Sequence, residues 1–359
     1  MSRIDLIFVG GFLGAGKTTL LHTAARTLSR RGRRVGLVTN DQAPQLFDTA
    51  LLGAAGPVAE VAGQCFCCGL DDLLGALDSL AEQGVDCILA EPVGSCTDLS
   101  ATLLQPLKDR HGERFRLAPL TVLADPDRLL DALEARSSDL HEATAYIYGL
   151  QLEEADRILV TKSDSLDEGV ADAIVGLTRQ AYPVPVDAIA AASEEGVAQW
   201  LDATLTGGPV GARILDIDYD RYALGEAVMG WLNATVRVSA AHTRLPALLV
   251  RSIRDQAAAS GAPIGHVKAL LRDDGPLALA QCTAVDGPVH TSRLGQPSGA
   301  PAELVLNARV QITPETLEAW VEHALTTALE STGTTAEVLD KSCFSPAYPR
   351  PTVRYDHVV

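Results

Sequence analysis

The residues whose types and spacing indicate the clearest chemistry stand near the start of the chain, in Gly11-Phe12-Leu13-Gly14-Ala15-Gly16-Lys17-Thr18. This stretch fits G-x-x-x-x-G-K-[ST], and it lies between an apolar run and a segment with helical spacing. Its glycines let successive backbone N–H groups surround an anion at the positive end of the following helix. The residues expected to contact phosphate are Gly11, Gly14, Ala15, Gly16, Lys17, Thr18 and Thr19. We expect Lys17 to reach the β- and γ-phosphates and the Thr18 hydroxyl to bind Mg²⁺.

A second motif, Thr161-Lys162-Ser163-Asp164, follows the apolar run 158–160. It has the form [NT]-K-x-D, in which the carboxylate accepts hydrogen bonds from guanine N1–H and N2–H₂. Adenine lacks this donor pair and would leave the acceptor unpaired, at a cost of about 1–3 kcal/mol. The motif therefore predicts GTP as the nucleotide, with Thr161, Lys162 and Asp164 at the base.

Two acidic residues are candidates for the Mg²⁺ and γ-phosphate side of the site. Glu91 ends the apolar run 85–90, the position of a Walker B residue that acts on Mg²⁺ or its waters, and Gly94 follows within reach of the γ-phosphate. Asp41 ends another such run and is a candidate for a switch that contacts Mg²⁺. The alternatives are a plain strand terminus for Glu91 and a turn carboxylate for Asp41.

Three thiols lie within four residues in Cys65-Phe66-Cys67-Cys68. Thiolates at this density suit a soft or borderline divalent ion such as Zn²⁺, with a fourth ligand from elsewhere or from solvent. Small buried cysteines and a redox pair are the alternatives.

The elements that must position these motifs alternate between short apolar runs and helical stretches. Strands are expected at 4–9, 34–39, 85–90, 120–124, 157–160 and within 184–191, and helices after the phosphate loop and at 71–83. Such alternation predicts an α/β P-loop NTPase fold, a parallel sheet with helices on both faces. Ligands of such sheets bind at the carboxyl ends of the strands, where these motifs fall.

The pattern changes at Thr206-Gly207-Gly208-Pro209, a cluster of helix and strand breakers. We expect a nucleotide-binding domain at 1–208, a smaller α+β domain at 209–342 and an extended, proline-containing tail at 343–359. Within the second domain, 234–238, 266–271, 277–284 and 304–310 have strand character, and 245–259 has helical character. A further helix should run to about residue 330, with Thr313 as its N-cap and Pro314 in its first turn.

Composition narrows the classes of function. The net charge of −17 argues against a general binder of nucleic acid or of anionic membranes. The basic cluster at Arg26, Arg30, Arg31, Arg33 and Arg34 is interpreted as the solvated end of a helix. Seven cysteines without a secretory signal or a membrane-spanning run indicate reduced thiols in the cytoplasm.

Four motifs, taken in order, resemble those of the CobW-type metallochaperone GTPases of the SIMIBI class. They are residues 11–21, the Gly-x-Cys-x-Cys-Cys block at 63–68, Glu91-x-x-Gly94 and Thr161-Lys-x-Asp164, and the resemblance covers about residues 3–205. The resemblance implies a GTPase with slow intrinsic turnover that binds Zn²⁺ or Co²⁺ at Cys65, Cys67 and Cys68. It implies delivery of that metal to a client metalloprotein or a cobalamin-related enzyme, with a homodimer as one assembly.

The chain also departs from the family pattern. Many members have an Asn-Glu-Phe-Gly switch where this chain has Asn40-Asp41-Gln42-Ala43, and many read Glu-Thr-x-Gly at 91–94 and carry a histidine-rich run. Cys96 either faces the metal or is only a small loop residue. These departures indicate a divergent branch with its own client.

The cysteine block lies between the two switch candidates, so its geometry should depend on the bound nucleotide. Three alternatives remain from the residues alone: a nucleotide-gated scaffold with negligible catalysis, a P-loop small-molecule kinase, and a thiol redox sensor. Free phosphate, phosphorylated product and reversible cysteine oxidation would distinguish them.

Overall fold

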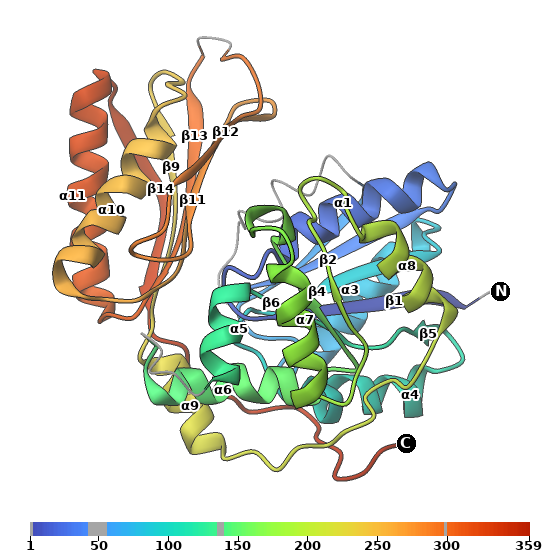
Figure 1. The fold of residues 1–359 in the computed structure, drawn as a ribbon. Coiled ribbons are helices and arrows are strands. Elements are labelled where there is room, and N and C mark those ends of the chain that lie inside the picture. The colour runs from blue at the N-terminus through green and yellow to red at the C-terminus, as the bar shows by residue number, and fades with distance from the viewer. Residues whose placement is uncertain (1–2, 42–55, 135–139, 298–299) are drawn as a thin grey trace.

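A parallel sheet forms the first half of the molecule (Figure 1). The computed structural model describes residues 3–41, 56–134, 140–297 and 300–359. The spatial order of the strands is β3-β2-β4-β1-β6-β7-β8, with β5 also paired to β1. In chain order the strands are β1 Ile4–Gly11, β2 Val35–Asp41, β3 Val58–Ala62, β4 Cys87–Glu91, β5 Phe115–Leu117, β6 Thr121–Ala124, β7 Arg157–Val160 and β8 Val186–Ala188. All of their pairings are parallel, so their carboxyl ends meet at one edge.

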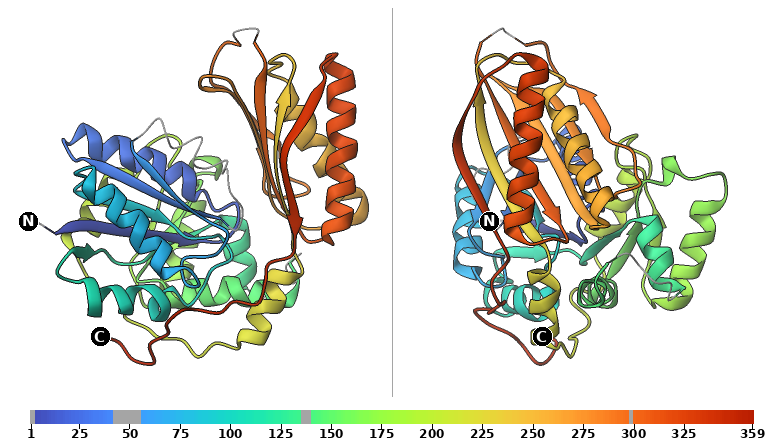
Figure 2. Two further views of the ribbon diagram at one scale, coloured as in Figure 1. Left: turned by 180° about the vertical axis from the view of Figure 1, so that it is seen from behind. Right: turned by 90° about the vertical axis from the view of Figure 1, so that its left-hand side faces the viewer.

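Helices cover both faces of this sheet, as predicted (Figure 2). Alternate residues of β1 show the division: Ile7 and Val9 pack in one core with Leu20 of the first helix, whereas Leu6 and Phe8 pack in a second core on the opposite face. The helices are α1 Lys17–Arg30, α3 Leu70–Glu82, α4 Gln105–His111, α5 Pro126–Leu133, α6 Glu142–Glu154, α7 Val170–Ala181, α8 Val197–Thr206 and α9 Tyr219–Ala227. A π-helical turn, Ser100–Leu104, precedes α4, and a 3₁₀ turn, Ser163–Ser165, follows β7.

The second half is built on an antiparallel sheet with two helices on one face. We call it the C-terminal sheet; its spatial order is β12-β11-β10-β13-β9-β14. Its elements are β9 Gly230–Val238, α10 Leu245–Ser260, β10 Ile264–Arg272, β11 Pro276–Cys282, β12 His290–Arg293, β13 Ala302–Val310, α11 Pro314–Thr332 and β14 Ala336–Phe344. Thr313 caps α11 by accepting a hydrogen bond from the Thr316 N–H, and Pro314 stands in the first turn, which confirms that prediction.

Four strands were not foreseen from the sequence: β3, β5, β12 and β14. β12 is exposed and polar, and the first half of β14 is exposed on both sides of the strand, with Val338 and Leu339 next to each other, so neither strand has the apolar alternation that marks a half-buried strand. β9 begins at Gly230, whereas the sequence predicted a strand only from residue 234. Its additional residues pair with β13 and, from Trp231, with β14.

The chain crosses between the two halves more than once (Figure 2). α9 packs on α6 of the first half before the chain enters the C-terminal sheet. After β14 the tail returns along the first half, where Arg354 Nε donates to Asp98 Oδ2 at 2.7 Å and Val359 N donates to Gln105 Oε1 at 2.9 Å. The domain limits at 208 and 342 remain predictions.

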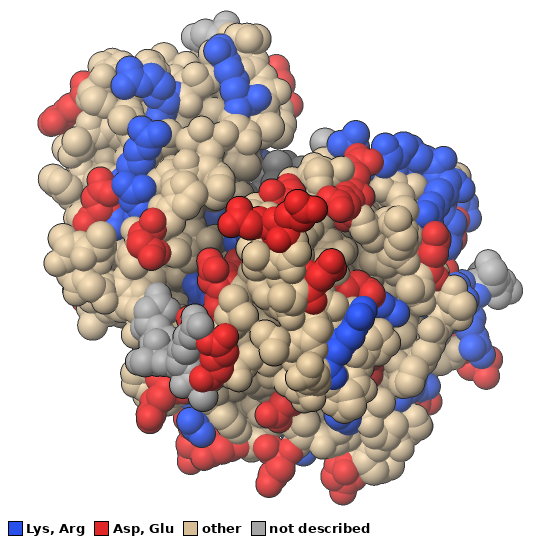
Figure 3. All heavy atoms as spheres, in the orientation of Figure 1, with Lys and Arg blue, Asp and Glu red and all other residues tan. Residues whose placement is uncertain are grey.

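Basic side chains gather at the end of α1, at the upper right of the view; others stand apart on the C-terminal half at the upper left, and acidic side chains are spread over much of the visible surface (Figure 3). Several of these arginines form ion pairs at or near the surface: Arg30 with Glu194, Arg31 with Asp202, and Arg33 with Asp86. This agrees with a solvated helix end. No helix in the described part of the chain has both the length and the apolar character needed to cross a bilayer.

Candidate functional site

The phosphate loop joins β1 to α1 as the sequence predicted. Lys17 is buried and donates through Nζ to the carbonyl oxygens of Gly11, at 2.8 Å, and Phe12, at 3.2 Å. Gly11 lies behind the loop, where a Cβ atom would stand 2.5 Å from the Leu123 carbonyl oxygen. The other predicted loop residues line a cavity of about 420 Å³: Gly14, Ala15, Gly16, Lys17, Thr18 and Thr19.

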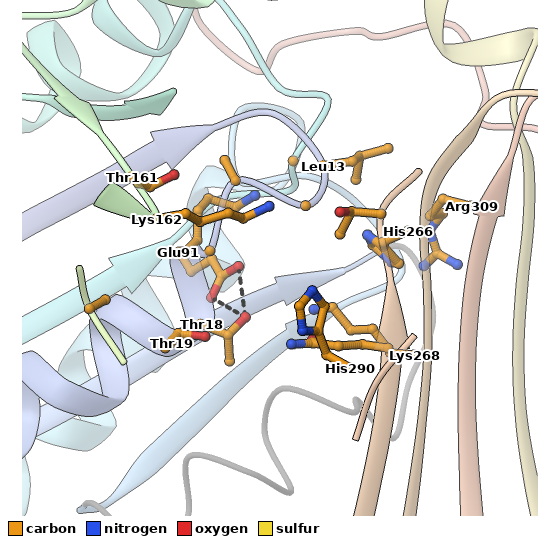
Figure 4. A pocket seen from close by; sticks show the side chains of 18 of the residues that line it. Leu13, Thr18, Thr19, Glu91, Thr161, Lys162, His266, Lys268, His290 and Arg309 are labelled. Atoms are coloured by element: carbon orange, nitrogen blue, oxygen red, sulfur yellow. Dashed lines mark hydrogen bonds between the residues drawn. The ribbon is translucent and has the colours of Figure 1, made fainter. Parts of the chain in front are cut away.

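Glu91 and Gly94 meet this loop from the end of β4. The Thr18 hydroxyl lies 3.3 and 3.4 Å from the two carboxylate oxygens of Glu91, and both side chains are buried (Figure 4). A Cβ atom on Gly94 would stand 2.7 Å from Leu13 Cδ2 and 3.0 Å from Lys17 Nζ. A side chain at this position would have to displace Leu13 or Lys17, so glycine lets this segment lie close to the phosphate loop.

The Thr161–Asp164 motif reaches the same cavity from the end of β7. Thr161 donates to the Ala124 carbonyl oxygen through both its N–H, at 2.9 Å, and its hydroxyl, at 3.2 Å. Lys162 has φ of 56° and donates to Asp125 Oδ2 at 2.6 Å, an ion pair that fixes the turn. Thr161, Lys162 and Asp164 all line the cavity, and Asp164 is exposed to it. The side chain of Asp41 lies outside the described residues.

The three thiols of Cys65, Cys67 and Cys68 converge: their sulfur atoms all lie within 4.8 Å of one another. Cys65 Sγ and Cys67 Sγ are 2.7 Å apart and buried, and Cys68 Sγ is 3.9 Å from Cys67 Sγ and half-buried. Hydrogen bonds from Cys67, Cys68 and Cys96 hold the pKa of Cys65 well below its ordinary value. The Cys65 sulfur is therefore stabilised as a thiolate, which is the form that binds metal.

Two further features surround the cysteine cluster. Cys96 is buried beside it, close enough to shift the pKa of Cys65 and Cys67. The C-terminal tail crosses the cluster: Arg350 N donates to Cys68 Sγ at 3.3 Å, and Thr352 donates to the carbonyl oxygens of Cys67, at 3.0 Å, and Cys68, at 2.8 Å. The cluster is thus covered by a segment more than 280 residues further along the chain.

Asn40 is a functional candidate that the sequence analysis missed. It lines the cavity and is buried. Its side-chain amide donates to the carbonyl oxygens of Val61, at 2.9 Å, and Gln64, at 2.7 Å, and its Oδ1 accepts from the Phe66 N–H at 2.9 Å. One side chain therefore lines this cavity and also holds the cysteine loop. Its place directly before Asp41 was the only signal in the sequence.

The cavity has a second wall that the motifs did not indicate. Ala191 and Ala192, which follow β8, line the cavity from the first half, where the Ser163 N–H donates to the Ile189 carbonyl oxygen at 3.2 Å. From the C-terminal sheet come Trp231, His266, Lys268, Leu279, Gln281, Thr283, His290 and Arg309. These residues come from β9 to β13 and the turns beside them, so they form no contiguous motif.

Comparison with known proteins agrees with this arrangement. Residues 5–183 match the family CobW/HypB/UreG, nucleotide-binding domain. The chain is 28% identical over 193 residues to the zinc chaperone CobW of Sinorhizobium sp, covering 46% of this chain and 52% of that protein. It is 29% identical over 174 residues to the zinc chaperone YjiA of Escherichia coli K12, covering 47% and 52%.

The chain spans about half the length of the curated relatives it matches. Among solved structures, that of Zn(II)-bound YjiA GTPase from E. coli aligns with a TM-score of 0.39 and 17% identity, covering 90% of this chain and 99% of that one. From the sequence match and the parallel sheet with its phosphate loop, the first half of this chain belongs to the CobW/HypB/UreG family of nucleotide-binding domains.

Proposed function

We propose that this chain is a cytoplasmic metallochaperone GTPase. It binds GTP with Mg²⁺, hydrolyses it slowly, and holds Zn²⁺ or Co²⁺ as cargo for a client metalloprotein or a cobalamin-related enzyme. The observation that carries the proposal is the Asn40 side chain, which lines the cavity, makes two hydrogen bonds to the cysteine loop at Gln64 and Phe66, and makes a third to Val61 at the end of β3. The names of the relatives, zinc chaperones, agree with it.

The nucleotide half rests on the loop geometry. Lys17 now donates to two carbonyl oxygens of its own loop, and a phosphate would exchange these neutral acceptors for charged ones, which bind an ammonium group about twice as strongly. In the proposal Asp164, which lines the cavity, accepts from the guanine edge, and this is supported by the hydrogen bonds of Thr161 and Lys162 that hold its turn.

The Thr18 hydroxyl and the Glu91 carboxylate fit Mg²⁺, because they bring oxygen ligands within 3.3 Å of each other beside Lys17. Mg²⁺ bound there would neutralise phosphate charge during hydrolysis. In the proposal Glu91 orients the ion or its waters, and the Gly94 N–H faces the terminal phosphate. Asp41 is proposed as the switch carboxylate.

The cargo half rests on the thiols. Three sulfur ligands within 4.8 Å suit a borderline ion such as Zn²⁺ or Co²⁺ and would disfavour Mg²⁺, which prefers oxygen. The two sites then remain chemically separate although they share one domain. Movement of Asn40 with the bound nucleotide would pull on Gln64 and Phe66, on either side of Cys65, and so change the sulfur geometry.

The test is metal analysis of protein purified without an affinity histidine tag, in GTP and in GDP. Wild type should hold about one Zn²⁺ per chain, in an amount that depends on the nucleotide. A variant with Cys65→Ser, Cys67→Ser and Cys68→Ser should lose it, and Cys343→Ser, a half-buried thiol in the C-terminal sheet, is the matched control. Metal content unchanged by the triple substitution would refute the cargo site. Phosphorylated small molecule in place of free phosphate would indicate a kinase instead.

A further inference from the structure

The C-terminal sheet has two chemically different faces. On β10, Val267, Ala269 and Leu271 pack in the apolar core that includes residues of α10 and α11. The alternate residues His266 and Lys268 lie on the opposite face, where they line the nucleotide cavity. The sheet therefore turns a polar face toward the phosphate loop.

The contact between this face and the phosphate loop is close. A Cβ atom on Gly14 would stand 2.7 Å from Thr283 Cγ2, so the loop and the turn after β11 leave no room for a side chain there. Arg128, at the start of α5, donates to the carbonyl oxygens of Ile264, at 3.0 Å, and Thr283, at 3.1 Å. These bonds attach the C-terminal sheet beside the loop.

The cavity has cations on both sides, and its excess of positive charge comes from the C-terminal sheet. Among its described lining residues, Lys17, Lys162, Lys268 and Arg309 stand against the two carboxylates Glu91 and Asp164, in a chain whose net charge is −17. Such a concentration of positive charge in an acidic protein favours a polyanionic ligand. The volume of about 420 Å³ lies in the range of small-molecule sites.

The positions of the cations indicate which part of the ligand they meet. Lys268 and His290 point from the C-terminal sheet toward the space in front of Thr18 and Glu91, whereas Thr161 and Lys162 lie across the cavity (Figure 4). Arg309 is fixed by stacking on Trp231, 4.0 Å from its ring centroid, and by donating to the Leu232 carbonyl oxygen. The proposed site of the base lies at Thr161. The terminal phosphate, at the opposite end of the nucleotide, would therefore lie near Thr18 and Glu91, where Lys268 points.

We propose that the C-terminal sheet is the second wall of the nucleotide site and that Lys268, with His290 beside it, binds the terminal phosphate of the triphosphate. This inference rests on the proposed function, because it needs a guanine nucleotide in the cavity. GDP lacks the phosphate that Lys268 contacts. The C-terminal sheet thus distinguishes the two nucleotide states directly, without relay through the first domain.

The test compares affinities for a non-hydrolysed GTP analogue and for GDP by equilibrium titration. Lys268→Met should weaken binding of the GTP analogue about tenfold, because a charge-assisted hydrogen bond is lost, and should leave GDP affinity within about twofold of wild type. Lys268→Arg should retain most of the GTP affinity, and His290→Gln should have a smaller effect of the same kind. Lys341→Met, on β14 and paired with Glu318 and Glu322, is the matched control and should change neither affinity.

Two results would overturn the inference. Unchanged affinity of Lys268→Met for both nucleotides would mean that the sheet does not contact the phosphates, and an equal fall for both would mean that Lys268 only supports the fold. In either case wild-type binding of GTP would leave the proposed function standing. Failure of wild type to bind guanine nucleotides would refute the proposed function itself.

Discussion

The parallel sheet presents its polar side chains at the ends of strands, whereas the C-terminal sheet presents them along one face. Thr18, Glu91 and Thr161 follow or flank the carboxyl ends of β1, β4 and β7. His266, Lys268 and Arg309 instead occupy alternate positions within β10 and β13. The first arrangement places the functional side chains on loops or next to them, where the backbone can move. The second places them on strands whose backbone is paired on both sides and therefore keeps their positions fixed.

The two arrangements also differ in how their side chains are held. On the face of the C-terminal sheet, His266 hydrogen-bonds to Asn307, which donates to Asn233 Oδ1 at 2.6 Å, and Arg309 donates to the same oxygen at 3.1 Å. Lys17, by contrast, donates to the carbonyl oxygens of its own loop. We infer a rigid wall facing an adaptable loop, with the nucleotide between them.

The largest expected effect comes from the loop side. Lys17→Ala removes the ammonium group nearest the expected β- and γ-phosphates, and we expect GTP and GDP affinity both to fall by about 100-fold, or about 3 kcal/mol. Isothermal titration with each nucleotide measures this. Loss of GTP binding alone would contradict the assignment, because it is the pattern expected for Lys268→Met.

The next effect concerns two ionisable side chains, Glu154 and His266, which are buried one in each half of the molecule. Burial raises the pKa of Glu154, in α6, to about 8, and lowers the pKa of His266 well below its ordinary value, so both are uncharged in the fold at neutral pH. Glu154 keeps its proton when folded and loses it above pH about 4.5 when unfolded. Its contribution to stability is therefore present at low pH and is lost as the pH rises toward 8.

Glu154→Gln should remove this dependence, so the free energy of unfolding should fall less steeply between pH 5 and 8 than in wild type, by about 1.4 kcal/mol per pH unit. Denaturant unfolding at several pH values measures the slope. Glu153→Gln, at the exposed neighbouring position, is the control and should leave the slope unchanged. Parallel slopes in wild type and Glu154→Gln would show that the buried carboxyl is charged in the fold.

The smallest effect concerns the tail, which leaves the C-terminal sheet and covers the cysteine cluster of the first half. Thr352→Ala loses the hydroxyl bond to the Cys68 carbonyl oxygen, worth about 1 kcal/mol, so the covered state should open about fivefold more often. The alkylation rate of Cys68 should rise accordingly, while that of Cys343 in the same sample should not. An unchanged rate at Cys68 would show that the tail does not limit access to the thiols.

The contrast between the two sheets explains what could be predicted from the sequence. Buried parallel strands are nearly continuous apolar runs, and the residues at their ends are contiguous with them, so the sequence alone predicts Lys17, Glu91 and Thr161 at one edge. The convergence of the three sulfur atoms could also be expected from the sequence, because the short spacing of the cysteines limits how far apart their side chains can lie.

The rest depended on contacts between distant parts of the chain. Lys268, His290 and Arg309 are brought together by antiparallel pairing whose register follows from long-range packing. Asn40 holds Phe66, 26 residues away, and the tail reaches Cys68 from Arg350. Local pattern carries no signal for such contacts.

The central claim is that nucleotide and metal are coupled through Asn40, and equilibrium titration of a non-hydrolysed GTP analogue with and without Zn²⁺ tests it most directly. In wild type we expect Zn²⁺ to change the affinity for the analogue by about fivefold or more, and the affinity for Zn²⁺ to change by the same factor when the analogue is bound. In Asn40→Ala, which loses the bonds to Gln64 and Phe66 of the cysteine loop and the bond to Val61, the ratio should approach one. Equal affinities with and without Zn²⁺ in the wild-type protein would contradict the account.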